Sequence, residues 1–245
     1  MNLMSKADLH LHTTYSDGRG TVPEVLAHVA CSDLRLIAIT DHDTIAGAVE
    51  AHRLASAFGV QVIVGEEVTT AEGELLALFI DSALPPGRPA AETIAAVHAQ
   101  GGLCIAPHPF AWGLPSLGKA GLRQRCAPGT TPSGVVAWQL DALEGFNASL
   151  TWPRSACNLA AQRAAHELGV PAVGGSDAHA VATIGRGYTL FPGRSVDDLY
   201  RAIQRHHLTW GGRCIGVADQ IDYCWHIVRR SARQACHMLA NSTPA

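Results

Sequence analysis

The sequence has few charged residues and lacks any long hydrophobic run. Only 16% of its 245 residues are charged and the formal net charge is −3, which disfavours stable binding to nucleic acid. No apolar run approaches the length of a membrane span, and the first residues lack the apolar core of a secretory signal. We therefore expect a cytoplasmic protein that does not enter a membrane.

Several catalytic motifs are also missing. The seven cysteines are scattered without a Cys-x-x-Cys pair, which is typical of a reduced protein with ordinary buried thiols. Neither a Gly-x-Ser-x-Gly elbow nor a phosphate-binding P-loop is present. Gly18-Arg19-Gly20 and Gly185-Arg186-Gly187 are too short to cradle a nucleotide unaided, although their arginines could reach a substrate phosphate. Chemistry based on a serine or cysteine nucleophile is therefore disfavoured.

The chain does contain a regular alternation of short apolar runs and helical patterns. Strands are expected at Ala7–His12, Leu34–Thr40, Val60–Val64, Glu74–Ile80, Leu103–Pro107, Leu140–Phe146, Pro171–Gly174 and Gly187–Phe191. Helices are expected at Val22–Cys31, Ile45–Phe58, Ala90–Gln100, Ser155–Leu168 and Val196–His206. The strand runs are nearly continuous in apolar residues, which favours a parallel sheet buried on both faces. Repeated βα units predict an α/β fold, either a barrel or a doubly wound sheet.

Two segments interrupt this alternation. Pro109–Val135 is rich in glycine and proline and is expected to form a long loop over one end of the sheet. Ile221–Leu239 has helical periodicity and is expected to pack against the rest of the fold. We therefore assign residues 1–212 to the main α/β domain and residues 213–245 to a C-terminal helix and tail.

The thirteen histidines are unusually many, and two of them lie at i and i+2 in the first expected strand. This spacing places His10 and His12 on one face of a strand, and Asp17 follows in a Ser-Asp-Gly turn. Imidazole and carboxylate groups together are suited to a metal site. Taken alone, the pattern also fits a half-exposed strand that carries two histidines by chance.

Similar side chains follow four further apolar runs. They are Asp41-His42-Asp43, Gly65-Glu66-Glu67, His108 and Ser176-Asp177-Ala178-His179. In a parallel α/β fold the carboxyl ends of the strands converge on one rim, where active sites form. The sequence therefore predicts a polynuclear metal centre at that rim.

The motifs resemble, in order, those of the PHP (polymerase and histidinol phosphatase) family. They are Asp8-Leu-His10-Leu-His12-Thr, Thr40-Asp41-His42-Asp43, Gly65-Glu66-Glu67-Val68, Pro107-His108-Pro109 and Ser176-Asp177-Ala178-His179. Glu144-Gly-Phe-Asn147 also resembles the Glu-x-x-Asn segment of that family. The resemblance implies a distorted (β/α)7 TIM-like barrel with its metal site at the C-terminal ends of the strands. It also implies two or three divalent ions, manganese, iron or zinc, and hydrolysis of phosphate esters.

The resemblance further implies how the ligands are divided. A first metal would be held by His10, His12, Glu67 and Asp177. Glu67 would bridge to a second metal, which it shares with His108. A third metal would be held by Asp17, His42 and His179.

The chain departs from the family pattern at two positions. Glu66 stands where relatives have an apolar residue; the pattern favours Glu67 as the ligand, but only the strand register decides which carboxylate points inward. Relatives carry Gly-His where this chain has Gly73-Glu74. Glu74 would either bind metal and harden the site or be exposed to solvent, and the sequence leaves both possibilities open.

The resemblance predicts a phosphatase or phosphodiesterase for a nucleotide or another small phosphorylated metabolite. A metal-activated hydroxide would attack phosphorus, with Asp177 at the catalytic centre. Arg19, Lys119 or Arg186 would neutralise the phosphoryl oxygens, and His179, where it does not bind metal, would protonate the leaving alkoxide. Histidinol-phosphate phosphatase and a non-catalytic metal-binding barrel are the alternatives. The sequence carries no signal for an oligomeric state.

Overall fold

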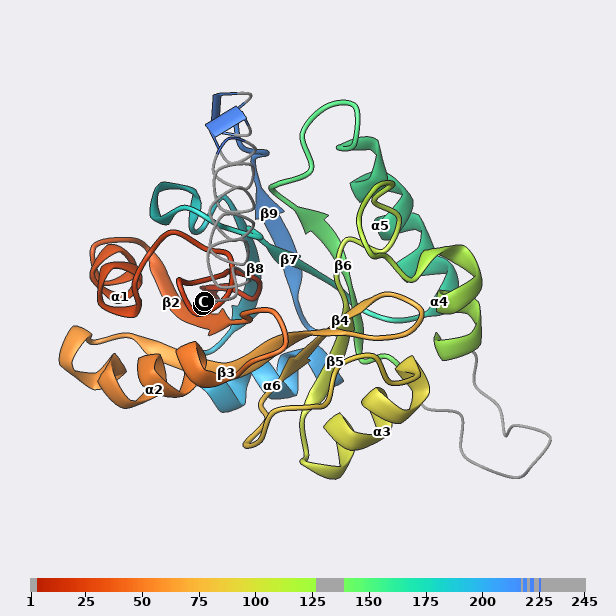
Figure 1. The fold of residues 1–245 in the computed structure, drawn as a ribbon, viewed down its shortest axis with the longest axis horizontal. Coiled ribbons are helices and arrows are strands. Elements are labelled where there is room, and N and C mark those ends of the chain that lie inside the picture. Colours follow the sequence, from red (N-terminus) through yellow and green to blue (C-terminus); the bar gives the residue numbers. More distant parts are fainter. Residues whose placement is uncertain (1–3, 127–138, 217, 220, 223–224, 226–245) are drawn as a thin grey trace, which may run out of the picture.

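A nine-stranded mixed sheet curls into a nearly closed barrel (Figure 1). The computed structural model describes residues 4–126, 139–216, 218–219, 221–222 and 225. The sheet order is β7-β6-β5-β4-β3-β2-β1-β8-β9. The strands are β1 (Met4–Asp8), β2 (Leu34–Ile39), β3 (Gln61–Thr69), β4 (Glu74–Leu78), β5 (Leu103–Ala106), β6 (Ala142–Asn147), β7 (Ala172–Gly175), β8 (Gly187–Pro192) and β9 (Thr209–Gly212). The distorted TIM-like barrel is confirmed.

Strand β7, at one end of the sheet order, meets β8, the strand next to the other end, through a side chain and without regular strand pairing. The hydroxyl of Thr189 in β8 accepts a hydrogen bond from the backbone N–H of Gly174 in β7 at 2.9 Å and donates to its carbonyl at 3.0 Å. A Cβ atom at position 174 would lie 2.5 Å from the carbonyl oxygen of Tyr188, so this close approach requires glycine. The contact brings β7 against β8 and nearly closes the barrel.

Helices cover the outside of the barrel and one of its ends. They are α1 (Val22–Ala30), α2 (Ala46–Phe58), α3 (Ala90–Ala99), α4 (Gly118–Cys126), α5 (Ala156–Leu168) and α6 (Val196–Gln204), together with the 3-10 helix η1 (Val181–Thr183). The five expected helices therefore form within one or two residues of their predicted bounds. No helix in the described part of the chain is long and apolar enough to cross a membrane.

Helix α6 closes the end of the barrel opposite the carboxyl ends of the strands. Leu199 and Ile203 of α6 belong to an apolar cluster with residues from β1 to β8. Because β8 ends beside the start of β1, with Pro192 paired to Met4, α6 begins at the amino end of β1. The rim at the carboxyl ends is therefore left for the loops that carry the polar side chains.

The sheet is mixed, which corrects the expectation of a parallel one. Strand β4 runs antiparallel to both β3 and β5, and β8 runs antiparallel to β1. Residues 70–73, which join β3 to β4, are too few for the crossover that a parallel pair needs. Glu74, the first residue of β4, is consequently placed at the rim where β3 ends.

Three elements were not predicted, namely α4, β9 and the short 3-10 helix η1. Pro109–Val135, expected to be a long loop, contains α4, and the expectation was wrong there. Strand β9, with the sequence Thr-Trp-Gly-Gly, has little of the apolar pattern of a strand. The rest of the expected loop, residues 127–138, and most of the expected helix Ile221–Leu239 lie outside the described residues.

Candidate metal centre

All nine side chains predicted as metal ligands converge on the rim of the barrel. The histidine–carboxylate cluster consists of His10, His12, Asp17, His42, Glu67, Glu74, His108, Asp177 and His179. His10 and His12 lie beyond the end of β1, not inside a strand as expected, and share the segment between β1 and α1 with Asp17. The other six side chains come from β3, from the start of β4 and from the segments that follow β2, β5 and β7. Within the described residues they form four overlapping groups, and the candidate ligand atoms of each group lie within 4.8 Å of one another.

Glu67 occupies the centre of this cluster. Its Oε2 lies 3.2 Å from Nε2 of His10, 3.3 Å from Nε2 of His12 and 3.4 Å from Nδ1 of His42. Its Oε1 lies 3.1 Å from Nε2 of His108. Burial alone would raise the pKa of Glu67, but His10 and His108 hold that pKa well below its usual range. One carboxylate thus faces four imidazoles.

Asp177 forms a second meeting point of imidazoles. Its Oδ1 lies 3.6 Å from Nε2 of His10, 3.4 Å from Nε2 of His12 and 3.5 Å from Nδ1 of His179. Burial opposes the ionised carboxylate, but the neighbouring imidazoles of His10 and His12 lower the pKa of Asp177 far below its usual value. The aspartate is therefore an anion among imidazole nitrogens.

A third group lies nearer to solvent. Asp17 Oδ2 is 3.2 Å from Nε2 of His179, and Asp17 Oδ1 is 3.8 Å from Nε2 of His42. The His42 side chain is 32% exposed, whereas that of His10 is fully buried. This part of the cluster forms the mouth of the site.

Glu74 lies inside the cluster. The antiparallel start of β4 directs it inward, with Oε1 3.6 Å from Nδ1 of His42 and Oε2 3.7 Å from Nε2 of His108. The residue is buried. Burial, together with the negative charge of Glu67, raises the pKa of Glu74 to about 8. Of the two alternatives for Glu74, exposure to solvent is excluded by this position.

Glu66 points to the opposite side of β3 from Glu67. Its Oε1 accepts a hydrogen bond from the backbone N–H of Leu84 at 2.6 Å, and its Oε2 has no hydrogen-bond partner among the described residues. Burial raises the pKa of Glu66 to about 7. The strand register thus places Glu67, and not Glu66, at the centre of the cluster.

Glu144 and Asn147 of β6 hold several members of the cluster in place. Glu144 Oε1 lies 3.0 Å from Nδ1 of His10, and Glu144 Oε2 accepts hydrogen bonds from the backbone N–H of His108 at 2.8 Å and from Asn147 at 2.9 Å. Asn147 also donates to Oδ2 of Asp177 at 3.1 Å. The family resemblance includes this segment, but the sequence did not indicate that Glu144 and Asn147 orient His10, His108 and Asp177.

Two further buried aspartates fix the loops beneath the cluster. Asp8 accepts hydrogen bonds from the backbone N–H groups of Ser176 and Gly185, and burial raises its pKa to about 6. Asp41 accepts hydrogen bonds at 2.7 Å from the backbone and hydroxyl of Thr13 and from the hydroxyl of Ser16. Asp41 thereby holds the loop that leads to Asp17.

The donor set fits divalent cations. Both ring nitrogens of His12 are buried and form no hydrogen bond among the described residues, although Glu67 and Asp177 lie within 3.4 Å of Nε2. The His12 ring also stacks on the rings of His42 and His179, at centroid distances of 4.6 Å and 4.3 Å. Imidazole nitrogens mixed with carboxylate oxygens are suited to zinc, iron or manganese.

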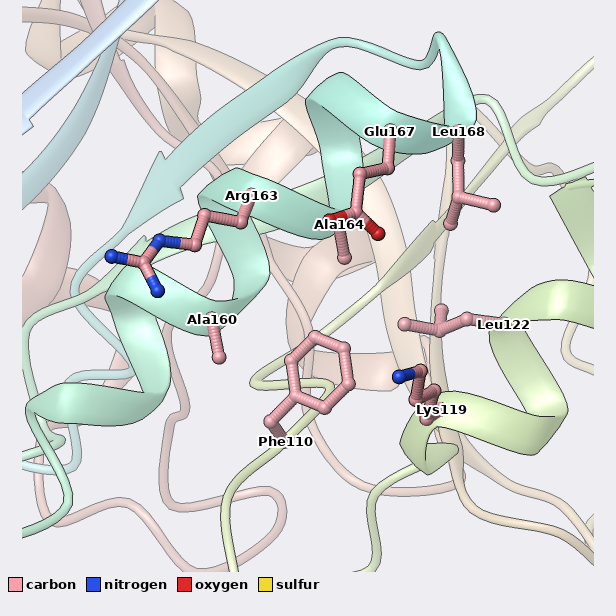
Figure 2. A pocket seen from close by; sticks show the side chains of 8 residues that line it. All are labelled: Phe110, Lys119, Leu122, Ala160, Arg163, Ala164, Glu167 and Leu168. Carbon is pink, nitrogen blue, oxygen red and sulfur yellow. The ribbon is translucent and has the colours of Figure 1, made fainter.

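The three cations predicted to contact a phosphate lie in different places. Arg19 donates its backbone N–H to the carbonyl of His179 at 2.9 Å, and its guanidinium pairs with Asp222. Arg186 is half-buried in the turn between η1 and β8, directly after Gly185. Lys119 lies on α4 and faces α5 across a cavity of about 240 Å³ (Figure 2). Within the part of the chain that the structure describes, Arg19 is the only one of the three that forms a hydrogen bond with a residue of the cluster.

Comparisons with known proteins agree with this geometry. The PHP domain model matches residues 8–103, and the PHP-associated model matches residues 157–207. Uncharacterized protein MJ1587 of Methanocaldococcus jannaschii is 40% identical over 154 residues, which is 58% of this chain and 82% of that protein.

Two relatives with named activities match over shorter regions. The phosphoribosyl 1,2-cyclic phosphate 1,2-diphosphodiesterase of Eggerthella lenta is 43% identical over 27% of this chain. The 3',5'-nucleoside bisphosphate phosphatase of Chromobacterium violaceum is 34% identical over 36% of this chain. These matches span only 26% and 30% of those two proteins.

Solved structures share the fold. A two-domain protein from Bacteroides vulgatus, containing a predicted PHP-like metal-dependent phosphoesterase, aligns with a TM-score of 0.69 at 17% identity over 90% of this chain and 69% of its own. PsfC from Pseudomonas syringae aligns with a TM-score of 0.60 at 17% identity, over 95% of this chain and 99% of its own. The family models and the relative from M. jannaschii show that the chain belongs to the PHP family of metal-dependent phosphoesterases.

Proposed function

We propose that the chain is a phosphatase or phosphodiesterase that acts on a small phosphorylated molecule with two or three divalent ions. The position of Glu67 carries this proposal, because its carboxylate lies within 3.4 Å of a nitrogen of four different histidines. Such a carboxylate can bridge two cations. The relatives that act on a cyclic phosphate and on a nucleoside bisphosphate support phosphoester hydrolysis.

The groups of atoms suggest how the ions would be held. His10, His12, Glu67 and Asp177 would bind one ion, and Asp17, His42 and His179 would bind another at the mouth. A further ion would be held by His108 and Glu74, and Glu67 would be a ligand of this ion as well as of the first. Each of these sets draws on the overlapping groups of the cluster.

The hydrogen bonds of the histidines indicate which nitrogens would face the ions. Nδ1 of His10 faces the carboxylate of Glu144, and Nδ1 of His179 lies 3.0 Å from the carbonyl oxygen of Asp177. A carbonyl only accepts, so Nδ1 of His179 carries a proton, and in the neutral ring Nε2 would then hold the lone pair that a metal ligand needs. This supports His179 as a ligand rather than as the proton donor to the leaving group.

Bound divalent ions would supply Lewis-acid polarisation of the phosphoryl group and lower the pKa of a water molecule. The protein's own residues would position the substrate. Arg19, beside His179, and Arg186, beside the turn held by Asp8, would neutralise the phosphoryl oxygens. Glu144 and Asn147 would keep His10 and Asp177 oriented.

Metal removal and restoration test this function. The purified protein is analysed for bound metal, stripped with a chelator and assayed with p-nitrophenyl phosphate and bis-p-nitrophenyl phosphate before and after addition of Mn²⁺. We expect loss of hydrolysis on stripping and recovery with Mn²⁺; the two substrates separate monoesterase from diesterase activity. Full activity in the stripped protein would contradict the proposal. Silence with both substrates and with a panel of phosphorylated metabolites, at full metal occupancy, would favour a non-catalytic barrel.

A further inference from the structure

We propose that Trp112, Trp152 and Arg154 form a subsite for the nucleobase of a mononucleotide substrate. The inference rests on the proposed phosphoesterase function and assigns a substrate class to it. The three residues lie in the two loops that leave neighbouring strands β5 and β6 at the rim.

The loop after β5 is fastened to the cluster. The carbonyl of His108 accepts hydrogen bonds from the backbone N–H of Ala111 at 2.9 Å and from the hydroxyl of Ser116 at 2.8 Å. The carbonyl of Pro115 accepts a hydrogen bond from the backbone N–H of Glu74 at 2.8 Å. Trp112 stands in this loop, four residues after His108 and therefore at most about 14 Å from it between Cα atoms. A mononucleotide can bridge such a separation.

The loop after β6 is fastened to the cluster as well. The hydroxyl of Ser149 donates to the carbonyl of Asp177 at 2.8 Å, and its backbone N–H donates to the side chain of Asn147 at 2.9 Å. Trp152 and Arg154 follow in the same loop, before α5. Both loops thus rise from residues that belong to the cluster or orient it.

The two loops meet through a contact between a cation and an aromatic ring. The guanidinium carbon of Arg154 lies 5.6 Å from the ring centroid of Trp112, within the range of a cation–π contact. The Trp112 residue is 61% exposed and Trp152 is 87% exposed. The exposed Trp112 indole with a guanidinium over it, and the exposed Trp152 two residues before that arginine, provide planar surfaces on which a ring can stack.

A nucleobase matches this chemistry. Each base has a π face that stacks on aromatic side chains, and a guanidinium can stack on the same base or hydrogen bond to its edge. The phosphoryl group of the same molecule would then reach the metal cluster, and Arg19 and Arg186 would face that group. A substrate that lacks a planar ring gains nothing from the indoles.

The test compares adenosine 5'-monophosphate with ribose 5-phosphate, which has the same phosphate ester without the base. We expect Trp112→Ala to lower kcat/KM for the nucleotide by about tenfold to a hundredfold, the range of base–aromatic stacking, and to change it less than about twofold for ribose 5-phosphate. Trp112→Phe should retain most of the activity toward the nucleotide. Equal effects on the two substrates, or no effect on the nucleotide, would overturn the subsite. Trp210→Phe is the control, because Trp210 stacks on Phe146 at 5.4 Å.

A binding measurement separates this subsite from the proposed function. Adenosine, which lacks a phosphate, is titrated into the full-length chain while tryptophan fluorescence is recorded, with ribose as the comparison. Saturable quenching by adenosine that is lost in the Trp112→Ala/Trp152→Ala double variant supports the subsite even if no ester is hydrolysed. Quenching that persists in the double variant, or its absence in the wild type, overturns the subsite and leaves phosphoester hydrolysis untouched.

Discussion

The carboxylate of Glu144 lies 3.0 Å from Nδ1 of His10 and turns Nε2 of that ring toward Glu67 and Asp177. The other oxygen of Glu144 accepts a hydrogen bond from the backbone N–H of His108, whose φ of +28° lies in the left-handed region. One buried carboxylate therefore orients one imidazole and supports the strained backbone that presents another.

Glu144→Gln should weaken metal binding without removing a proposed ligand. The amide is a weaker acceptor than the carboxylate for His10 and for the His108 backbone, and loss of such a partner lowers metal affinity by about tenfold to a hundredfold. Isothermal titration of Mn²⁺ into stripped protein measures the change. Glu167→Gln on α5 is the matched control, and equal affinities for the two variants would contradict the orienting role.

Glu67→Gln should abolish most hydrolysis. Because Glu67 faces four imidazoles, its loss should cost more than the loss of an orienting partner, about a hundredfold or more in kcat. Glu66→Gln makes the same chemical change one residue away on the other side of the strand, and it should keep activity near that of the wild type. A similar loss in both variants would point to a general effect of the strand on folding.

Glu74→His should alter the choice of metal. A carboxylate favours harder ions such as Mn²⁺, and an imidazole is better suited to Zn²⁺, so the ratio of Zn²⁺ to Mn²⁺ affinity should rise. Competition against a chromogenic chelator measures that ratio. Glu92→His on the exposed face of α3 controls for zinc binding by an added surface histidine. An unchanged ratio in Glu74→His would argue against Glu74 as a ligand.

Glu66 should make the metal-free protein less stable as the pH rises. Burial raises its pKa from 4.5 to about 7, so the folded state binds the proton more tightly than the unfolded chain. The free energy of unfolding therefore falls as the pH increases through this window. After allowance for solvent screening, we expect the wild type to lose about 1–2 kcal/mol relative to Glu66→Gln between pH 4.5 and pH 7.5.

Urea unfolding of both proteins in the presence of a chelator measures this difference. The free energy of unfolding of the wild type should fall relative to that of Glu66→Gln as the pH rises. A constant difference would mean that Glu66 titrates with the same pKa in the folded and unfolded chains.

The sequence predicted the position of the site better than the direction of the strands. Polar side chains at strand ends identify a rim whichever way the neighbouring strands run, and the structure brings the nine candidate ligands together there. Apolar runs cannot distinguish a parallel from an antiparallel neighbour, which is why the reversal of β4 was missed. That reversal, imposed by a short connection, places Glu74 in the cluster.

Other features depended on information that a linear pattern does not hold. Glu66 and Glu67 are adjacent and chemically identical, and only the register of β3 separates their environments. Helix α4 begins with Gly118 and contains Gly121, two residues of low helix propensity, so the segment did not read as a helix. The cation–π contact of Arg154 with Trp112 joins residues 42 positions apart, and no local pattern indicates it.

Metal content per chain tests the central claim most directly. Wild type and Glu67→Gln are stripped, equilibrated with Mn²⁺, freed of unbound metal by gel filtration and analysed by mass spectrometry for bound manganese. We predict two or three ions per wild-type chain and at most one in the Glu67→Gln variant. Less than one ion per wild-type chain, or equal occupancy in both proteins, would contradict a polynuclear centre built around Glu67.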